Sequence, residues 1–124
     1  MAARRLGWYG RGSVEAPTVT VLRHGDDQAT IVCVGEFDHA SVPLLRDAFA
    51  EAMTAELESL RLDTTSVDFL DSIGLGVLLA AALQCEAAGI KFSLDPSPTV
   101  SRLLSMTALA DLVHGRVIRP GDSP

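Results

Sequence analysis

The feature that most constrains the fold is an alternation of strand-like and helix-like segments along most of the chain. Short runs of alternating or apolar residues predict strands at 18–23, 28–37, 59–63, 90–95 and 116–120, and the first of them is rich in β-branched residues. Apolar residues at helical spacing predict helices at 41–57, at 73–88 and from Pro98 onward. Two neighbouring strands followed by helix–strand repeats are typical of an α/β domain. We therefore expect a single α/β domain in which helices pack against a mixed β-sheet of about five strands.

The first two predicted strands form a hairpin. The segment 18–23 alternates in polarity, and the residues HGDD at 24–27 supply the chemistry of a turn. The partner segment, 28–37, is almost continuously apolar. Such a run is typical of a central strand that is covered on both faces.

The first predicted helix, 41–57, has Ser41 as its N-cap and Pro43 in its first turn. Its apolar residues repeat at amphipathic spacing, at Leu45, Ala48, Phe49 and Ala52. The short strand at 59–63 follows, and then a polar loop, TTSVDF.

The second predicted helix, 73–88, is apolar nearly all round, which is typical of a helix that is largely buried. Gly89 is suited to end it. Ser97 as N-cap and Pro98 as the first helical residue predict the start of the third helix.

Length and charge limit the classes of function. The chain has 124 residues, which suits one domain. We expect this domain at 18–119, between a flexible arm at 1–17 and a tail at 120–124. A net charge of −6, with scattered basic residues, argues against nucleic acid as a partner and favours a basic protein.

Two further patterns concern location. The basic start of the chain lacks the apolar region of a signal peptide. The longest apolar stretch, within 73–83, is too short to span a bilayer. We therefore predict a cytoplasmic protein that does not associate with membranes.

The cysteines and histidines predict no special chemistry. Cys33 and Cys85 lie in apolar runs, and we expect both to be buried and unlinked. The three histidines have no ligand spacing with either cysteine, so we expect no metal site and no cofactor.

The segment FLDSIGLG at 69–76 contains the strongest candidate site. Ser72 occupies a predicted N-cap position, where unpaired N–H groups favour an anion such as phosphate. Gly74 and Gly76 would each destabilise a helix by roughly 1 kcal/mol relative to alanine, and both leave room for a partner to approach. The alternative is that Ser72 only begins a helix.

A second segment, GEFDHAS at 35–41, ends a predicted central strand and precedes a helix. Connections that leave strand ends gather at one edge of an α/β sheet. We therefore predict that Asp38 lies on the same face as Asp71 and Ser72, with Asp68 nearby. The alternative for Asp38 is a turn or capping residue.

These segments, together with SPTVSRLLSMTALADLV at 97–113, resemble the STAS domains of bacterial anti-sigma factor antagonists. The resemblance runs from about residue 18 to residue 118, and Asp-Ser-x-Gly-Leu-Gly is its specific signature. It implies a cytoplasmic regulator of transcription in a stress response. Such proteins bind an anti-sigma factor that is also a serine kinase, and this binding frees the sigma factor.

The resemblance also implies a switch. The kinase would phosphorylate Ser72, the phosphorylated protein would release the kinase, and a PP2C-type phosphatase would restore it. Asp38 matches the family's aspartate at the kinase-facing surface, and Asp71 matches the acid before the phosphosite. The partner-binding residues implied in this way are Asp38, Asp71, Ser72, Ile73 and Gly74.

One position departs from the family pattern. The residue after the phosphosite is often small and hydroxylated in the family, whereas this chain has Ile73. A bulky side chain there narrows access to Ser72 or selects among kinases.

Two alternatives stay open. The first is a STAS module that is never phosphorylated and serves as a scaffold or as a sensor of a nucleotide or small ligand. The second is an enzyme with Ser72 as nucleophile, but the G-x-S-x-G motif requires a glycine where this chain has Leu70. We therefore predict a binding protein and not an enzyme.

Overall fold

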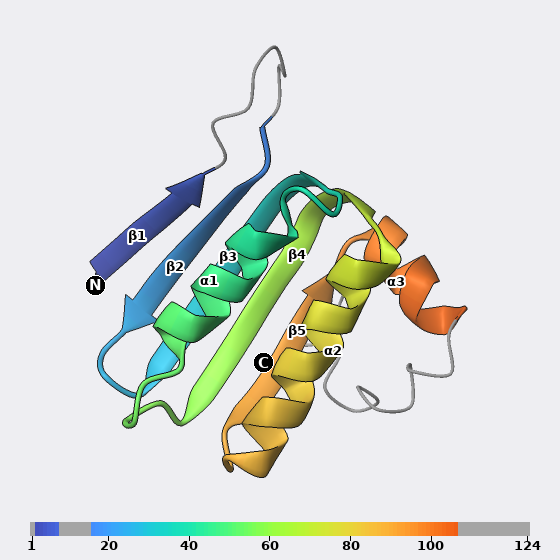
Figure 1. Ribbon diagram of the computed structural model, residues 1–124. Coiled ribbons are helices and arrows are strands. Elements are labelled where there is room, and N and C mark those ends of the chain that lie inside the picture. Colours follow the sequence, from blue (N-terminus) through green and yellow to red (C-terminus); the bar gives the residue numbers. More distant parts are fainter. Residues whose placement is uncertain (1, 8–15, 107–124) are drawn as a thin grey trace.

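A five-stranded sheet organises the part of the chain that the structure describes, residues 2–7 and 16–106 of a computed structural model (Figure 1). Its elements are β1 (Ala2–Gly7), β2 (Thr18–His24), β3 (Gln28–Phe37), α1 (Val42–Ala52), β4 (Ser59–Leu70), α2 (Ser72–Ala87), β5 (Lys91–Pro96) and α3 (Pro98–Ser105). The strands lie in the order of the sequence, β1-β2-β3-β4-β5. The first pairs, β1 with β2 and β2 with β3, are antiparallel, whereas β3 with β4 and β4 with β5 are parallel. The predicted mixed α/β sheet is confirmed.

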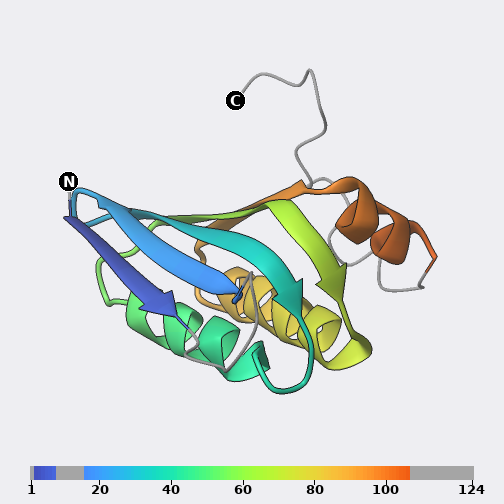
Figure 2. The ribbon, with the colours of Figure 1, turned by 90° about the horizontal axis from the view of Figure 1, so that it is seen from above.

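Helices α1 and α2 form one layer on one side of this sheet. Figure 2 shows α1 and α2 side by side beneath the strands, with α3 near the carboxyl ends of β4 and β5. The core lies between the two layers and includes Ile31, Leu45, Leu62, Leu78 and Leu94. The prediction that β3 is covered on both faces is wrong for the described chain. Helices cover only one of its faces, and Val34 is 43% exposed.

The edge strand β1 differs from the expected flexible arm at 1–17. Ala2–Gly7 pairs with β2 from Ala2 opposite Arg23 to Gly7 opposite Thr18. Main-chain hydrogen bonds attach an edge strand to the neighbouring strand. The order of side chains in the sequence therefore gives little indication of the pairing. The predicted strand at 116–120 and the tail at 120–124 lie outside the described residues.

Strand β4 corrects the predicted loop after residue 63, because it continues to Leu70. Its pairing with β3 shifts register between Val32 and Val34 and again between Gly35 and Glu36. Bulges of this kind break the alternation of buried and exposed residues, so the segment TTSVDF looks like a loop in the sequence. Gly35 permits one shift because its φ of 109° belongs to the region that favours glycine.

The ends of the helices agree in part with their predicted capping residues. Ser97 caps α3, since its side chain accepts a hydrogen bond from the Val100 N–H at 3.0 Å. Gly89 follows the C-cap of α2 with a φ of 73°, as expected. Helix α1 is shorter than the predicted 41–57, because it ends at Ala52 and the chain turns back toward β4.

Helix α2 packs on one side only, so the prediction of a largely buried helix is wrong. Its inner residues Leu75, Leu78, Ala82 and Cys85 are buried. On its outer side Ile73 and Leu83 are exposed although they too are apolar. A sheet covers one side of a helix, and the described chain provides no second layer for the other side.

The cysteines behave as predicted. Cys33 and Cys85 are free and buried. Burial raises the pKa of both thiols, and the nearby Asp63 carboxylate adds to the shift at Cys33. In the described residues, no helix is long and apolar enough to cross a membrane.

Candidate functional site

The candidate site lies where β3 and β4 end side by side. Phe37 is the register partner of Leu70, and the N–H of Asp71 donates to the carbonyl of Phe37 at 3.2 Å. Asp38 and Asp71 are the next residues of the two strands, so parallel pairing brings them to one end of the sheet. The structure therefore places Asp38 next to the Asp71-Ser72 pair, as predicted.

Asp38 organises the turn into α1. One of its carboxylate oxygens, Oδ1, accepts hydrogen bonds from the Ala40 N–H at 3.0 Å and from the Ser41 N–H at 3.1 Å. Ser41 Oγ lies 3.2 Å from the same oxygen. Ser41 is at the predicted N-cap position, but its side chain makes no capping hydrogen bond to α1. Asp38 therefore has the turn role that was the alternative interpretation. Its side chain is also exposed.

The surroundings of Asp38 favour its ionised form. Partial desolvation acts to raise the pKa of Asp38, but the hydrogen bonds from Ser41 and Ala40 oppose it. The charge of His39 acts in the same direction as these bonds, and the pKa of Asp38 lies below its usual value. Asp38 therefore presents a negative charge at neutral pH.

The N-cap of α2 is Asp71 and not Ser72, which corrects the prediction. The backbone of Asp71 is extended, and its Oδ1 accepts from the Gly74 N–H at 2.9 Å. Ser72 is consequently the first helical residue and is exposed. Aspartate and serine are equally good N-cap residues, and the sequence has one of each in succession, at Asp71 and Ser72. The Ser72 hydroxyl is left without a capping role.

The two glycines of the motif have different environments. Gly74 is buried, and a Cβ there would lie 2.5 Å from Leu70 Cδ1 and 3.5 Å from Val42 Cγ2. Gly76 is exposed, and a Cβ there would meet nothing within 4 Å. Gly74 therefore lets α2 pack closely on the strand end and on α1. The expectation that Gly74 provides open approach for a partner is wrong, and only Gly76 leaves such space.

Exposed apolar and acidic residues lie close to Ser72 along the chain and at the end of the neighbouring strand. Ile73 is 50% exposed, and Phe69, at the end of β4, is 45% exposed. Asp68 is exposed, as is Glu36, the register partner of Phe69. Sequence reasoning missed Phe69 and Glu36 because one lay in a predicted loop and the other in a strand. The aromatic residue two positions before Asp71 was the available signal.

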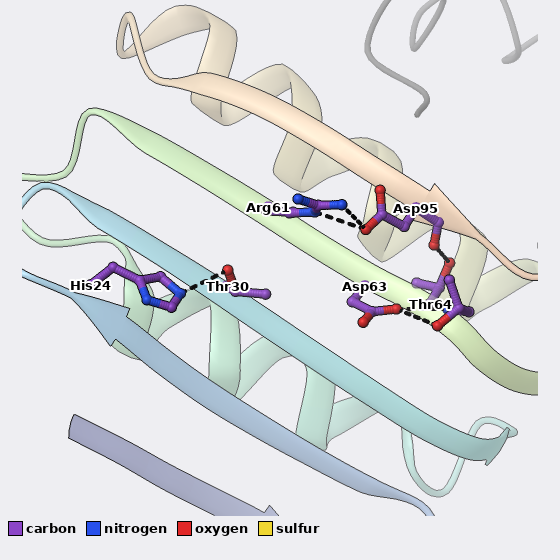
Figure 3. A network of polar contacts seen from close by, with 7 residues as sticks. His24, Thr30, Arg61, Asp63, Thr64 and Asp95 are labelled. Atoms are coloured by element: carbon purple, nitrogen blue, oxygen red, sulfur yellow. Dashed lines mark hydrogen bonds and ion pairs between the residues drawn. The ribbon is translucent and has the colours of Figure 1, made fainter. Parts of the chain in front are cut away.

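A second polar cluster joins β4 to β5, and its residues Arg61, Asp63 and Asp95 lie on the sheet face away from α1 and α2 (Figure 3). Arg61 Nε and Nη2 both lie 2.7 Å from Asp95 Oδ2, which joins β4 to β5. Thr64 donates to the carbonyl of Asp95 at 2.7 Å, and Thr65 donates to the Asp63 carboxylate at 2.6 Å. The arginine offsets the repulsion between Asp63 and Asp95, which are register partners. These contacts hold the strands in register.

The described residues contain no group of three or more His, Cys, Asp or Glu side chains placed to hold a metal ion.

The family model for the STAS domain matches residues 19–120. The chain belongs to the STAS domain family. The signature segment and its serine thus lie within a STAS domain.

Similar proteins carry related names. The anti-sigma-B factor antagonist of Listeria monocytogenes is 29% identical over 100 residues, which cover 78% of this chain and 86% of that protein. The structure of the anti-sigma factor antagonist SpoIIAA in its unphosphorylated form is similar with a TM-score of 0.68 and 22% identity, covering 84% of this chain and 89% of that one. An anti-sigma factor antagonist from Mycobacterium paratuberculosis has the same TM-score and identity, covering 84% of this chain and 97% of that one. These structures share the fold.

Proposed function

We propose that this STAS protein is an anti-sigma factor antagonist that binds an anti-sigma factor serine kinase and is switched off by phosphorylation of Ser72. The observation that carries the proposal is the position of Ser72. It is exposed on the first turn of α2, directly after the capping residue Asp71 and at the sheet end that also holds Asp38. A PP2C-type phosphatase would reverse the modification. The protein acts by binding and not by catalysis.

The local geometry supports a switch that leaves the fold intact. Asp71 caps the helix, so a phosphate on Ser72 displaces no capping hydrogen bond. The modification adds about −1.5 to −2 charges at neutral pH. Asp38 and Asp71 already make this sheet end acidic, and no lysine or arginine occurs between Arg61 and Lys91. Added charge and bulk therefore weaken docking by repulsion and by obstructing the surface.

The test is a titration of the partner kinase with the unmodified protein, the phosphorylated protein and Ser72→Ala. We expect phosphorylation to weaken binding about five- to 150-fold, the usual range of a coupling free energy. Ser72→Ala should bind whether or not ATP is present. Equal affinity of the phosphorylated and unmodified proteins would refute the switch.

Ile73 favours a second candidate, a STAS scaffold or ligand sensor that is never phosphorylated. Its half-exposed, β-branched side chain adjoins the hydroxyl that a kinase must reach. Incubation with ATP and the partner kinase separates the two candidates, because the scaffold stays unmodified. Ile73→Ser is the matched variant, and it should become phosphorylated if the isoleucine alone blocks access.

A further inference from the structure

The outer face of α2, turned away from the sheet, is mostly apolar, and Gln84 is an exposed polar residue on it. Its exposed residues follow a repeat of three and four positions, at Ile73, Gly76, Ala80, Leu83 and Ala87, here called the outer stripe. Leu83 is 45% exposed, and α2 contains no charged residue before Glu86. A contiguous exposed apolar surface is a candidate interaction site.

The spacing of the outer stripe is that of the contact positions in paired helices. Large and small residues also occupy it in a particular order. With a second α2 antiparallel and Ala80 facing Ala80, Ile73 lies opposite Ala87, and Leu83 lies opposite Gly76. Every large side chain then faces a small one, as close packing requires. Parallel pairing would instead place leucine on leucine and glycine on glycine.

We propose that the outer stripe of α2 binds the outer stripe of a second copy of this chain, with the two helices antiparallel about a two-fold axis at Ala80. A two-fold interface uses the same patch on both copies, so the patch must be complementary to itself. The outer stripe meets this condition. The proposal does not depend on the proposed phosphorylation of Ser72.

Charge and neighbouring surface support a second copy as the occupant. Two chains of net charge −6 repel each other over most of their surfaces. The outer stripe has no charged side chain, so it is a place where two copies can approach. A groove between α1 and α2 adjoins the outer stripe at Ala80, and its lining includes Phe49, Met53 and Val77 as well as the polar residues Arg46 and Gln84.

The size of the surface sets the expected strength. Helix α2 has 16 residues, so the contact is about 24 Å long. One helix pair of that length buries less than the roughly 1,200 Å² of a stable interface. The association should therefore be weak and reversible, and it should be seen at high protein concentration.

Sedimentation equilibrium of the full chain from micromolar to about millimolar concentration tests the surface. We expect a concentration-dependent dimer. Ala80→Glu places two carboxylates face to face at the axis and should weaken the dimer more than about tenfold. Ala55→Glu is the matched control, because it adds the same charge at an exposed residue after α1. Circular dichroism should show that both variants remain folded.

Cross-linking tests the antiparallel arrangement. Ala80→Cys should form a disulfide-linked dimer under mild oxidation, whereas Ala55→Cys should not. A mixture of Ile73→Cys and Ala87→Cys proteins should give mixed dimers in preference to dimers of either variant alone. Cys33 and Cys85 are buried and leave a low background.

Three results would overturn the proposal. The first is a monomer at every concentration, and the second is a dimer that Ala80→Glu does not weaken. The third is preferred linkage of Ile73→Cys to itself, which would indicate parallel helices. Binding of the anti-sigma factor to the outer stripe of a chain that stays monomeric would identify a different occupant.

Discussion

Helices α1 and α2 lie side by side on the same face of one sheet, yet their outer faces differ (Figure 1). Both bury leucine and alanine against the strands. The outer side of α1 carries Arg46 and Asp47, whereas the outer side of α2 carries Ile73 and Leu83. Packing on the sheet therefore determines only the inner side of each helix. The outer side of α2 makes no contact with the sheet, yet it has apolar residues that are exposed to solvent.

The beginnings of the two helices differ as well. Asp38 holds the turn before α1 through N–H groups that precede the helix. Asp71 caps α2 directly through the Gly74 N–H. Ser41 is consequently buried in its turn, while Ser72 is exposed. Of the two serines at helix starts, only Ser72 is accessible to a partner.

The largest expected effect separates the two sides of α2. Leu78→Ala, on the buried side, should lower the free energy of unfolding by about 2–5 kcal/mol, because it leaves a cavity. Leu83→Ala, on the half-exposed side, should lower it by less than about 1.5 kcal/mol. Urea unfolding of dilute protein measures both. Similar losses for the two leucines would contradict the division into an inner and an outer side.

The glycines of the motif should respond in opposite directions. Gly74→Val should destabilise the protein by about 1–3 kcal/mol, because Leu70 and Val42 occupy the space of the new side chain. Gly76→Ala should stabilise it by roughly 0.5–1 kcal/mol, since a methyl group there meets nothing and favours the helix. Thermal unfolding compares them. Stabilisation by valine at 74 would show that the close contact with Leu70 is not a constraint.

A smaller effect distinguishes the cap from the exposed serine. Asp71→Ala removes the acceptor of the Gly74 N–H and should cost about 1 kcal/mol. Ser72→Ala removes no capping bond and should change stability by less than about 0.5 kcal/mol. Chemical unfolding of both variants checks the order. A greater loss at Ser72 would restore the serine as the cap.

The smallest effect concerns the charge of Asp38. Its pKa is lowered in the folded state, so its ionisation contributes stability above the unfolded value of about 3.9. This contribution is lost as the pH falls through the lower, folded pKa. Asp38→Asn retains an acceptor oxygen and should make stability less dependent on pH below about 5. Unfolding curves of both proteins at acid pH measure the difference, and superimposable profiles would exclude this role.

Local chemistry explains why much of the fold could be predicted. Ser97 and Pro98 begin a helix, Gly89 follows one, and HGDD turns a hairpin, because each acts through its own backbone or that of near neighbours. The juxtaposition of Asp38 with Asp71 was predictable for a related reason. Both follow strands that run parallel, and the ends of such strands meet at one edge.

The sequence by itself thus determined the α/β class, the position of α2 after the signature and the membership in the STAS family that its motif indicated. Tertiary structure alone decided that β4 continues through two register shifts, that Ala2–Gly7 adds a strand, and that Asp71 and not Ser72 caps α2. It also decided which glycine of the motif is packed and which is open. The physical reason is that pairing and packing depend on residues distant in sequence, and that two adjacent residues competed for one capping position. Periodicity records that a face is apolar, but only the packed chain shows whether anything covers it.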